Sequence, residues 1–101
     1  MKEILGREMY DKEGKFIGKI LPTGWILNEK REIIGRISFR GNSIEIYNLK
    51  GDLIGNICSD GTIFIPKWKK VGVITPSGNV YNEKWKFLGK WNIFPLLFPE
   101  S

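Results

Sequence analysis

The sequence predicts an all-β domain of five short β-hairpin repeats arranged about an axis, with little or no helix. Three observations support this prediction: a repeat of about 17 residues, two turn signals in most copies, and strand-forming residues between the turns. A fixed internal period is the signature of repeat architectures. Hairpins of this length cannot bury a face alone, so neighbouring copies must pack together.

Each copy contains a glycine preceded by a branched apolar residue, here called the landmark glycine. In four copies an Asp or Asn stands seven positions earlier, whereas the remaining copy starts less regularly at Pro66. The landmark glycines lie 17, 20, 17 and 17 residues apart, and they are Gly18, Gly35, Gly55, Gly72 and Gly89. The longer interval places three extra residues between Gly41 and Gly55. Only the third copy is therefore lengthened, within or beside residues 43–47.

The two turn signals differ in chemistry. The first begins with Asp or Asn and has Gly three positions later, as in residues 11–14 and 48–51, which is typical of a type I turn with a bulge. The second is a short pair typical of a two-residue hairpin loop, and its copies are Thr23-Gly24, Gly41-Asn42, Asp60-Gly61 and Ser77-Gly78. Two turns in each copy leave room only for short strands.

The segments between the turns are rich in β-branched and aromatic residues, which favour strands. A glycine inside a strand indicates a bulge, a bend or the close approach of another backbone. Apolar residues stand one position before and two positions after each landmark glycine. We expect a kink at the glycine to turn both sets inward, where they form most of the core.

Closure of the repeats into a ring is favoured over a linear array, because an open array leaves strand edges exposed. Residues 2–6 look like the end of a further copy and are expected to pair with the last copy around Trp91. This predicts a barrel-like or propeller-like arrangement. Residues 1–94 then form a single repeat domain, and residues 95–101 form an apolar C-terminal tail.

The hairpin copy at residues 10–20, Tyr-Asp-Lys-Glu-Gly-Lys-Phe-Ile-Gly-Lys-Ile, resembles the repeats of the small bacterial beta-flower proteins. The resemblance covers about residues 4–94 and implies four or five hairpin units around an axis. The function of that family is uncharacterised, so the resemblance implies no catalytic residue. A single copy also resembles the PRC-barrel motif of RNA-processing adaptors, but five copies argue against that assignment.

Composition excludes several classes of function. The chain has 101 residues, no histidine and one cysteine, so it offers no disulfide framework and no transition-metal cluster. A triad with histidine as its base is excluded, and the scattered acidic residues are typical of turns. The sequence has no apolar run long enough for a membrane span and no signal peptide. We therefore expect a cytoplasmic, non-enzymatic protein without a cofactor.

The net charge of +5 permits a polyanionic partner without requiring one. Two groups of residues are candidates for anion or nucleic-acid binding. The first group directly follows landmark glycines and would form a ring on one face: Lys19, Arg36 and Lys90. The second is the densest basic cluster, in which an aromatic ring could stack on a base: Lys67, Trp68, Lys69 and Lys70. The competing interpretation for both groups is a solvated surface.

The end of the chain departs from the repeat. It is strongly apolar and interrupted by Pro95 and Pro99, which exclude a regular central strand. It either packs across the domain as a lid or leaves an apolar patch that marks an interface. The candidate interface residues are Trp91, Ile93, Phe94, Leu96, Leu97 and Phe98.

Together these features favour a non-enzymatic binding or assembly module with a protein partner or self-association. The alternative is an adaptor that binds RNA or another anion through a basic face.

Overall fold

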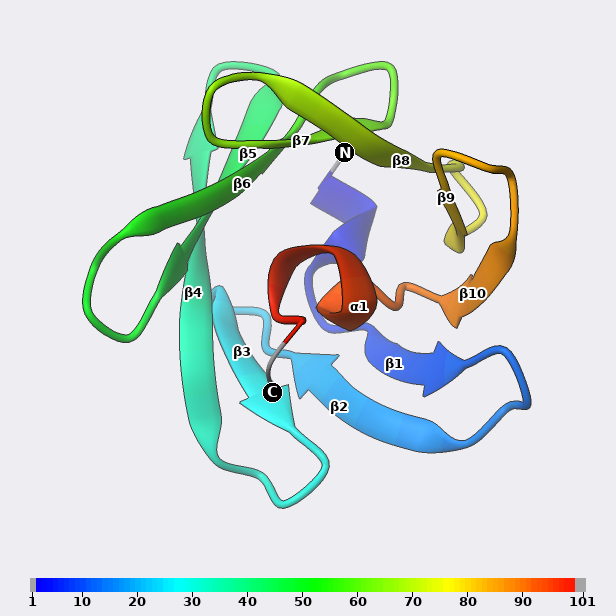
Figure 1. Cartoon of the computed structure of the whole chain (residues 1–101). Coiled ribbons are helices and arrows are strands. Elements are labelled where there is room, and N and C mark those ends of the chain that lie inside the picture. The colour runs from blue at the N-terminus through cyan, green and yellow to red at the C-terminus, as the bar shows by residue number, and fades with distance from the viewer. Residues whose placement is uncertain (1, 100–101) are drawn as a thin grey trace.

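The computed structural model describes residues 2–99, and within them ten strands form a closed antiparallel barrel (Figure 1). Every strand pairs with its neighbours in sequence, and β1 pairs with β10 to complete the ring. The strands are β1 (Glu8–Asp11), β2 (Phe16–Ile20), β3 (Trp25–Asn28), β4 (Ile33–Arg40), β5 (Ser43–Asn48), β6 (Leu53–Ile57), β7 (Thr62–Ile65), β8 (Lys69–Ile74), β9 (Asn79–Asn82) and β10 (Phe87–Lys90). The predicted all-β class and the axial arrangement of hairpins are confirmed.

The ring closes through β1, not through the first residues of the chain as the sequence suggested. Tyr10 pairs with Lys90 and Asp11 pairs with Gly89. Residues before β1 instead form a short 3-10 helix, η1 (Lys2–Ile4), whose Ile4 side chain is fully buried. Closure leaves no unpaired edge strand in the described sheet, which removes the edges that invite aggregation.

In four of the five hairpins, the side chain of the residue that starts the first turn holds that turn together. The Oδ1 atom of Asn28 accepts hydrogen bonds from the backbone N–H groups of Lys30 and Glu32, at 2.9 and 3.0 Å. The side chains of Asp11, Asn48 and Asn82 make the same pair of bonds in their own turns. Asp and Asn are favoured here because the side chain stabilises the turn directly. In the fourth hairpin Ile65 occupies this position.

The second turns differ from the expectation of two-residue loops. Only Gly41-Asn42 is one, since Arg40 pairs directly with Ser43. The other three turns span four residues each. In the first of them, the N–H of Leu21 donates to the carbonyl of Trp25, and the N–H of Gly24 donates to the carbonyl of Leu21. The glycine therefore ends a longer turn and has a positive φ, +100° at Gly24. The three extra residues of the third copy lengthen the β4–β5 hairpin.

A β-bulge precedes the landmark glycine in each hairpin. Gly18 pairs with Met9 and Phe16 pairs with Tyr10, so Ile17 has no partner of its own. The bulge re-aims Ile17 toward the interior, where it packs on the core together with the fully buried Ile20. Both apolar sets therefore face inward, as the kink hypothesis required.

The middle of the barrel is filled by side chains that the sequence analysis did not single out. Each landmark glycine pairs across the hairpin with a fully buried aliphatic residue. These residues are Met9, Ile26, Ile46, Ile63 and Val80. They repeat with the same period as the glycines, and they form the core together with the isoleucines two positions after the glycines.

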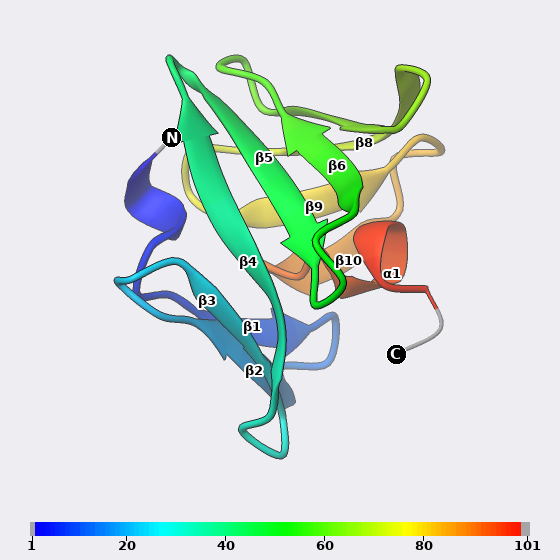
Figure 2. The same cartoon turned by 90° about the vertical axis from the view of Figure 1, so that its left-hand side faces the viewer.

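The two ends of the barrel are closed by the two ends of the chain (Figure 2). η1 lies at one end, and the single-turn helix α1 (Phe94–Leu97) lies at the other, inside the ring of first turns (Figures 1 and 2). Residues 93–98 are here called the plug. No helix in residues 2–99 has the length and apolar character needed to cross a membrane.

The plug fits the barrel because the landmark glycines have no side chain. A Cβ on Gly18 would stand 2.9 Å from the ring of Phe94, and one on Gly72 would stand 2.8 Å from Leu96. Gly35 faces Phe98 and Gly55 faces Leu97 in the same way. At several of these glycines the neighbouring strand's carbonyl oxygen is also too close for a Cβ. The repeated glycine therefore makes the socket for the C-terminal segment.

Candidate nucleic-acid interface

The basic residues that follow the landmark glycines point away from the barrel interior, because the glycines face inward and side chains alternate along a strand. The three residues do not form one ring, because only Lys19 and Lys90 share a groove and Arg36 lies elsewhere. Lys19 and Lys90 line one shallow groove near η1, where the Lys90 Nζ donates to the Ser77 carbonyl at 3.0 Å. The Arg36 guanidinium lies elsewhere, 4.3 Å from the centre of the Tyr47 ring.

The first turn of the fourth hairpin has an unusual backbone conformation, and it carries the exposed residue Trp68. Without an Asp or Asn at its start, the turn holds both Lys67 and Trp68 at positive φ, +71° and +59°. A bulky residue rarely adopts this conformation. Trp68 is 67% exposed, and its ring meets that of Phe64 edge to face, with ring centres 5.4 Å apart. Most of the Trp68 surface is thus open to solvent.

Trp68 borders a groove on the outer wall, here called the Trp68 groove, with a volume of about 340 Å³. The groove runs between the turn that carries Trp68 and the lengthened β4–β5 hairpin, with β6 below it. It is lined by Arg40, Ser43, Glu45, Leu53, Asn56, Ile65, Pro66, Lys67 and Trp68. The extra length of the third copy thus supplies one wall of this groove.

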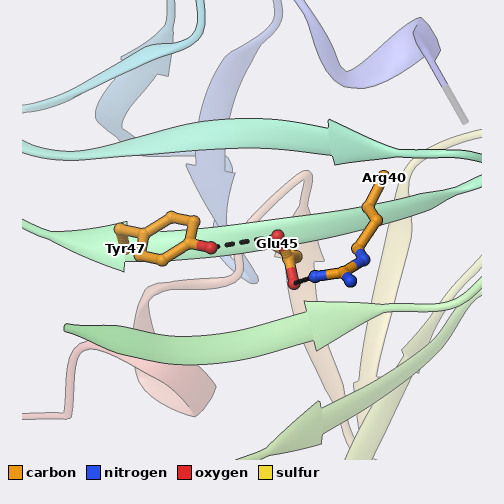
Figure 3. A network of polar contacts seen from close by, with 3 residues as sticks. All are labelled: Arg40, Glu45 and Tyr47. Atoms are coloured by element: carbon orange, nitrogen blue, oxygen red, sulfur yellow. Dashed lines mark hydrogen bonds and ion pairs between the residues drawn. The ribbon is translucent and has the colours of Figure 1, made fainter. Parts of the chain in front are cut away.

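A polar network of three side chains lies on the β4–β5 hairpin, which forms the wall of the groove opposite Trp68 (Figure 3). The Tyr47 hydroxyl donates to Glu45 Oε1 at 3.0 Å, and the Arg40 guanidinium lies 3.6 Å from Glu45 Oε2. The hydrogen bond to Glu45 raises the pKa of Tyr47 above its usual value. The Glu45 side chain is only 14% exposed, whereas that of Arg40 is 81% exposed. Arg40 therefore keeps donor groups available to a ligand.

The electrostatics of this region are cationic. Lys67 and Arg40 line the groove, and Lys69 and Lys70 are exposed on β8 beside it. Among the lining residues themselves, two cations, Lys67 and Arg40, stand against one carboxylate, Glu45, whose oxygens already contact Tyr47 and Arg40. The predicted cluster Lys67, Trp68, Lys69 and Lys70 is thus joined by Arg40, which is distant in sequence.

A second exposed tryptophan occupies the matching turn of the next hairpin. Trp85 stands 17 residues after Trp68, is 68% exposed and has φ +63°. Its ring packs against Tyr81 with centres 6.0 Å apart, and exposed lysines at positions 84 and 86 flank it. Trp85 was not among the residues predicted to bind nucleic acid, although the repeat period from Trp68 leads directly to it.

The tail residues expected to form an interface pack within their own chain. Ile93, Leu97 and Phe98 are 0%, 4% and 9% exposed, and Phe94 and Leu96 are half-buried against the core. Trp91 is also buried, beneath the Arg7 guanidinium. Of the two arrangements that the sequence left open, the structure has the lid, and an interface through these residues stays a prediction.

Comparison with protein-family models finds no match for the sequence, and comparisons with curated proteins and with solved structures find none either. The likeness to the beta-flower repeats accordingly stays a resemblance.

Proposed function

We propose that this protein is a non-enzymatic binding module that holds a single-stranded nucleic acid in the Trp68 groove. The observation that supports this most directly is an exposed indole, displayed by a strained turn, at the edge of a groove lined by cations. Backbone outliers of this kind cluster at ligand sites, where the surrounding structure compensates for their cost.

The chemistry of the groove suits a base that is not paired. A base splayed out from a single strand can stack on the exposed ring of Trp68, as bases do on aromatic platforms in proteins that bind single strands. Lys67 and Arg40 stand on opposite sides of the groove and can contact the phosphates on either side of that base. Between them, Ser43 and Asn56 offer donors and acceptors to a base edge or a ribose.

The same groove favours binding without catalysis. General acid–base chemistry needs a positioned group that is free to exchange a proton with the substrate. Glu45 is the one carboxylate in the groove, and Tyr47 and Arg40 engage both of its oxygens. Its geometry fits a role in holding Arg40 and the groove wall in place.

Fluorescence anisotropy with labelled oligouridylate and oligodeoxythymidylate tests the proposal, and a labelled hairpin duplex provides the paired comparison. We expect both single strands to bind more tightly than the duplex, with an affinity that falls as salt rises because phosphate contacts release counterions. Trp68→Ala should weaken single-strand binding about tenfold, since stacking on one aromatic ring contributes ~1–3 kcal/mol.

Trp25→Ala is the matched control, because Trp25 is also an exposed tryptophan, 41% exposed, at the start of β3. It should leave the affinity unchanged. The contribution of positive charge is tested by comparing the single-strand affinity of Lys67→Ala with that of Lys12→Ala, which lies in the turn of the first hairpin. Equal effects of Trp68→Ala and Trp25→Ala, or no binding at low salt, would reject a nucleic acid and return the protein to the class of protein-binding modules.

A further inference from the structure

A larger groove lies at the α1 end of the barrel, on a different part of the surface from the Trp68 groove. It has a volume of about 610 Å³ and lies between the first turns of the first two hairpins and the plug. Its walls include Asp11, Glu29, Glu32 and Phe94, and Asn92 forms part of its floor. We call it the Asn92 groove.

Asn92, which lines this groove, carries a covered hydrogen-bond acceptor without a partner. The residue is 2% exposed, and its Nδ2 donates to the Leu88 carbonyl at 2.7 Å. Its Oδ1 is buried and has no partner among residues 2–99. A buried acceptor without a donor is unfavourable, and such groups in native proteins call for an explanation. The missing partner must be a group that carries an N–H or O–H.

The charges around the groove narrow the chemistry of that group. Three carboxylates, from Asp11, Glu29 and Glu32, line it against one ammonium, from Lys30. Asp11 is occupied by its own turn, and Glu32 accepts a hydrogen bond from Asn28 at 2.9 Å. Glu29 makes no hydrogen bond or ion pair within the described chain. In a protein of net charge +5, this groove is therefore locally acidic, and its charge favours a cation over an anion.

The remaining walls are apolar. The Phe94 and Phe98 rings meet edge to face with centres 5.7 Å apart, and Ile17 and Ile34 lie beside them in the groove. No group of three or more Asp, Glu, Cys or His side chains within residues 2–99 is placed to hold a metal ion. The groove therefore fits a cation that carries both N–H donors and an alkyl chain, and aromatic faces attract such cations.

We propose that the Asn92 groove binds a primary alkylammonium group. The ammonium donates to Asn92 Oδ1 and is attracted by Glu29 and Glu32, and its alkyl chain lies along Phe94 and Phe98. Because Oδ1 is covered in the structure, binding requires a small side-chain movement in the groove wall. This proposal does not depend on nucleic-acid binding at the Trp68 groove.

The test is a titration of the isotope-labelled full-length protein with n-pentylammonium chloride, followed by amide NMR. We expect saturable shifts that include the Asn92 side-chain amide and the backbone amides of residues 28–32. Tetramethylammonium, which has no N–H, and 1-pentanol, which has no charge, should each bind much more weakly. No saturable shift, or equal affinity for tetramethylammonium, would overturn the proposal.

The double variant Glu29→Gln, Glu32→Gln should weaken binding about fivefold, because each exposed charge contributes modestly. The control Glu3→Gln, Glu83→Gln removes the same amount of charge elsewhere on the protein. Glu83 occupies the turn position in the fifth hairpin that Glu29 occupies in the second. Equal losses in the two double variants would also overturn the proposal.

Titration with Nα-acetyl-lysine amide identifies the source of the amine: tighter binding than pentylammonium indicates a lysine side chain, and weaker binding indicates a free amine.

Discussion

Gly55 of β6 packs directly against the Leu97 side chain of the plug, and a Cβ added to residue 55 would overlap that side chain. The nearest backbone atom to that point, the Phe64 carbonyl oxygen, is 3.2 Å away. At Gly72, in contrast, the Tyr81 carbonyl oxygen is nearer than the Leu96 side chain. Two glycines at equivalent positions of the repeat are therefore required for different immediate reasons.

This difference can be measured with double-mutant cycles. Gly55→Ala should destabilise the fold by ~1–3 kcal/mol through overpacking. Combined with Leu97→Ala, it should cost less than the sum of the two single variants, because the shortened side chain makes room for the new methyl group. Gly72→Ala should not be rescued by Leu96→Ala, since a backbone oxygen causes that overlap. Urea denaturation of the six variants gives the energies, and equal coupling in both cycles would contradict the interpretation.

Removal of the plug should expose the barrel interior. A chain that ends at Ile93 loses the side chains of Phe94, Leu97 and Phe98, and the half-buried ring of residues around Ile17 and Ile34 becomes accessible. We expect a lower melting temperature and self-association of the truncated chain, because exposed apolar patches drive association. Sedimentation velocity compares the association state of the truncated and full chains, and thermal melts compare their stability. An unchanged melting temperature would show that the plug contributes little to stability.

The turn of the second hairpin offers a stabilising substitution. Arg31 has φ +65°, at a position that glycine occupies in the first and third hairpins. The left-handed conformation costs an ordinary residue ~1–2 kcal/mol, a cost that glycine avoids. Arg31→Gly should therefore raise stability by about 1 kcal/mol, visible in thermal melts. Lys30→Gly, one residue earlier in the same turn, is the control and should not stabilise the protein.

The Tyr47–Glu45 hydrogen bond predicts a loss of stability in alkali. The folded state raises the pKa of Tyr47 above its usual value of 10.0, so folding favours the protonated hydroxyl. Its contribution is fully present below pH 10 and is lost as the pH rises through the higher pKa of the folded state. In Glu45→Gln the pKa of Tyr47 should fall and the alkaline loss should become smaller. Titration monitored by tyrosinate absorbance and urea melts across this range check both outcomes.

Much of the architecture could be predicted from the sequence because it is encoded locally. Asp11, Asn28, Asn48 and Asn82 specify their turns through bonds to residues two and four positions away, and such signals can be read without a partner strand. The kink before the landmark glycine was predicted for the same reason. The long second turns were missed because pairs such as Thr23-Gly24 are also typical of two-residue loops, whereas here the glycine ends a four-residue turn.

The candidate site was predictable only in part. Lys67 and Trp68 stand out as a local cluster, but Arg40 and Asn56 reach the Trp68 groove from other hairpins. Likewise, nothing near Asn92 in the sequence indicates that its oxygen is buried beside the turns of the first two hairpins. Such meetings depend on strand order and register, which short-range patterns do not contain.

The sequence by itself determined the number of hairpins, the positions of their turns and the all-β class, since periodicity and turn chemistry act over a few residues. Tertiary structure alone decided that β1 seals the ring against β10, and that the glycines form a socket for the plug. It also decided which charged side chains share a groove. The physical reason is the same in each case: these features arise from contacts between distant segments, and packing in three dimensions selects them.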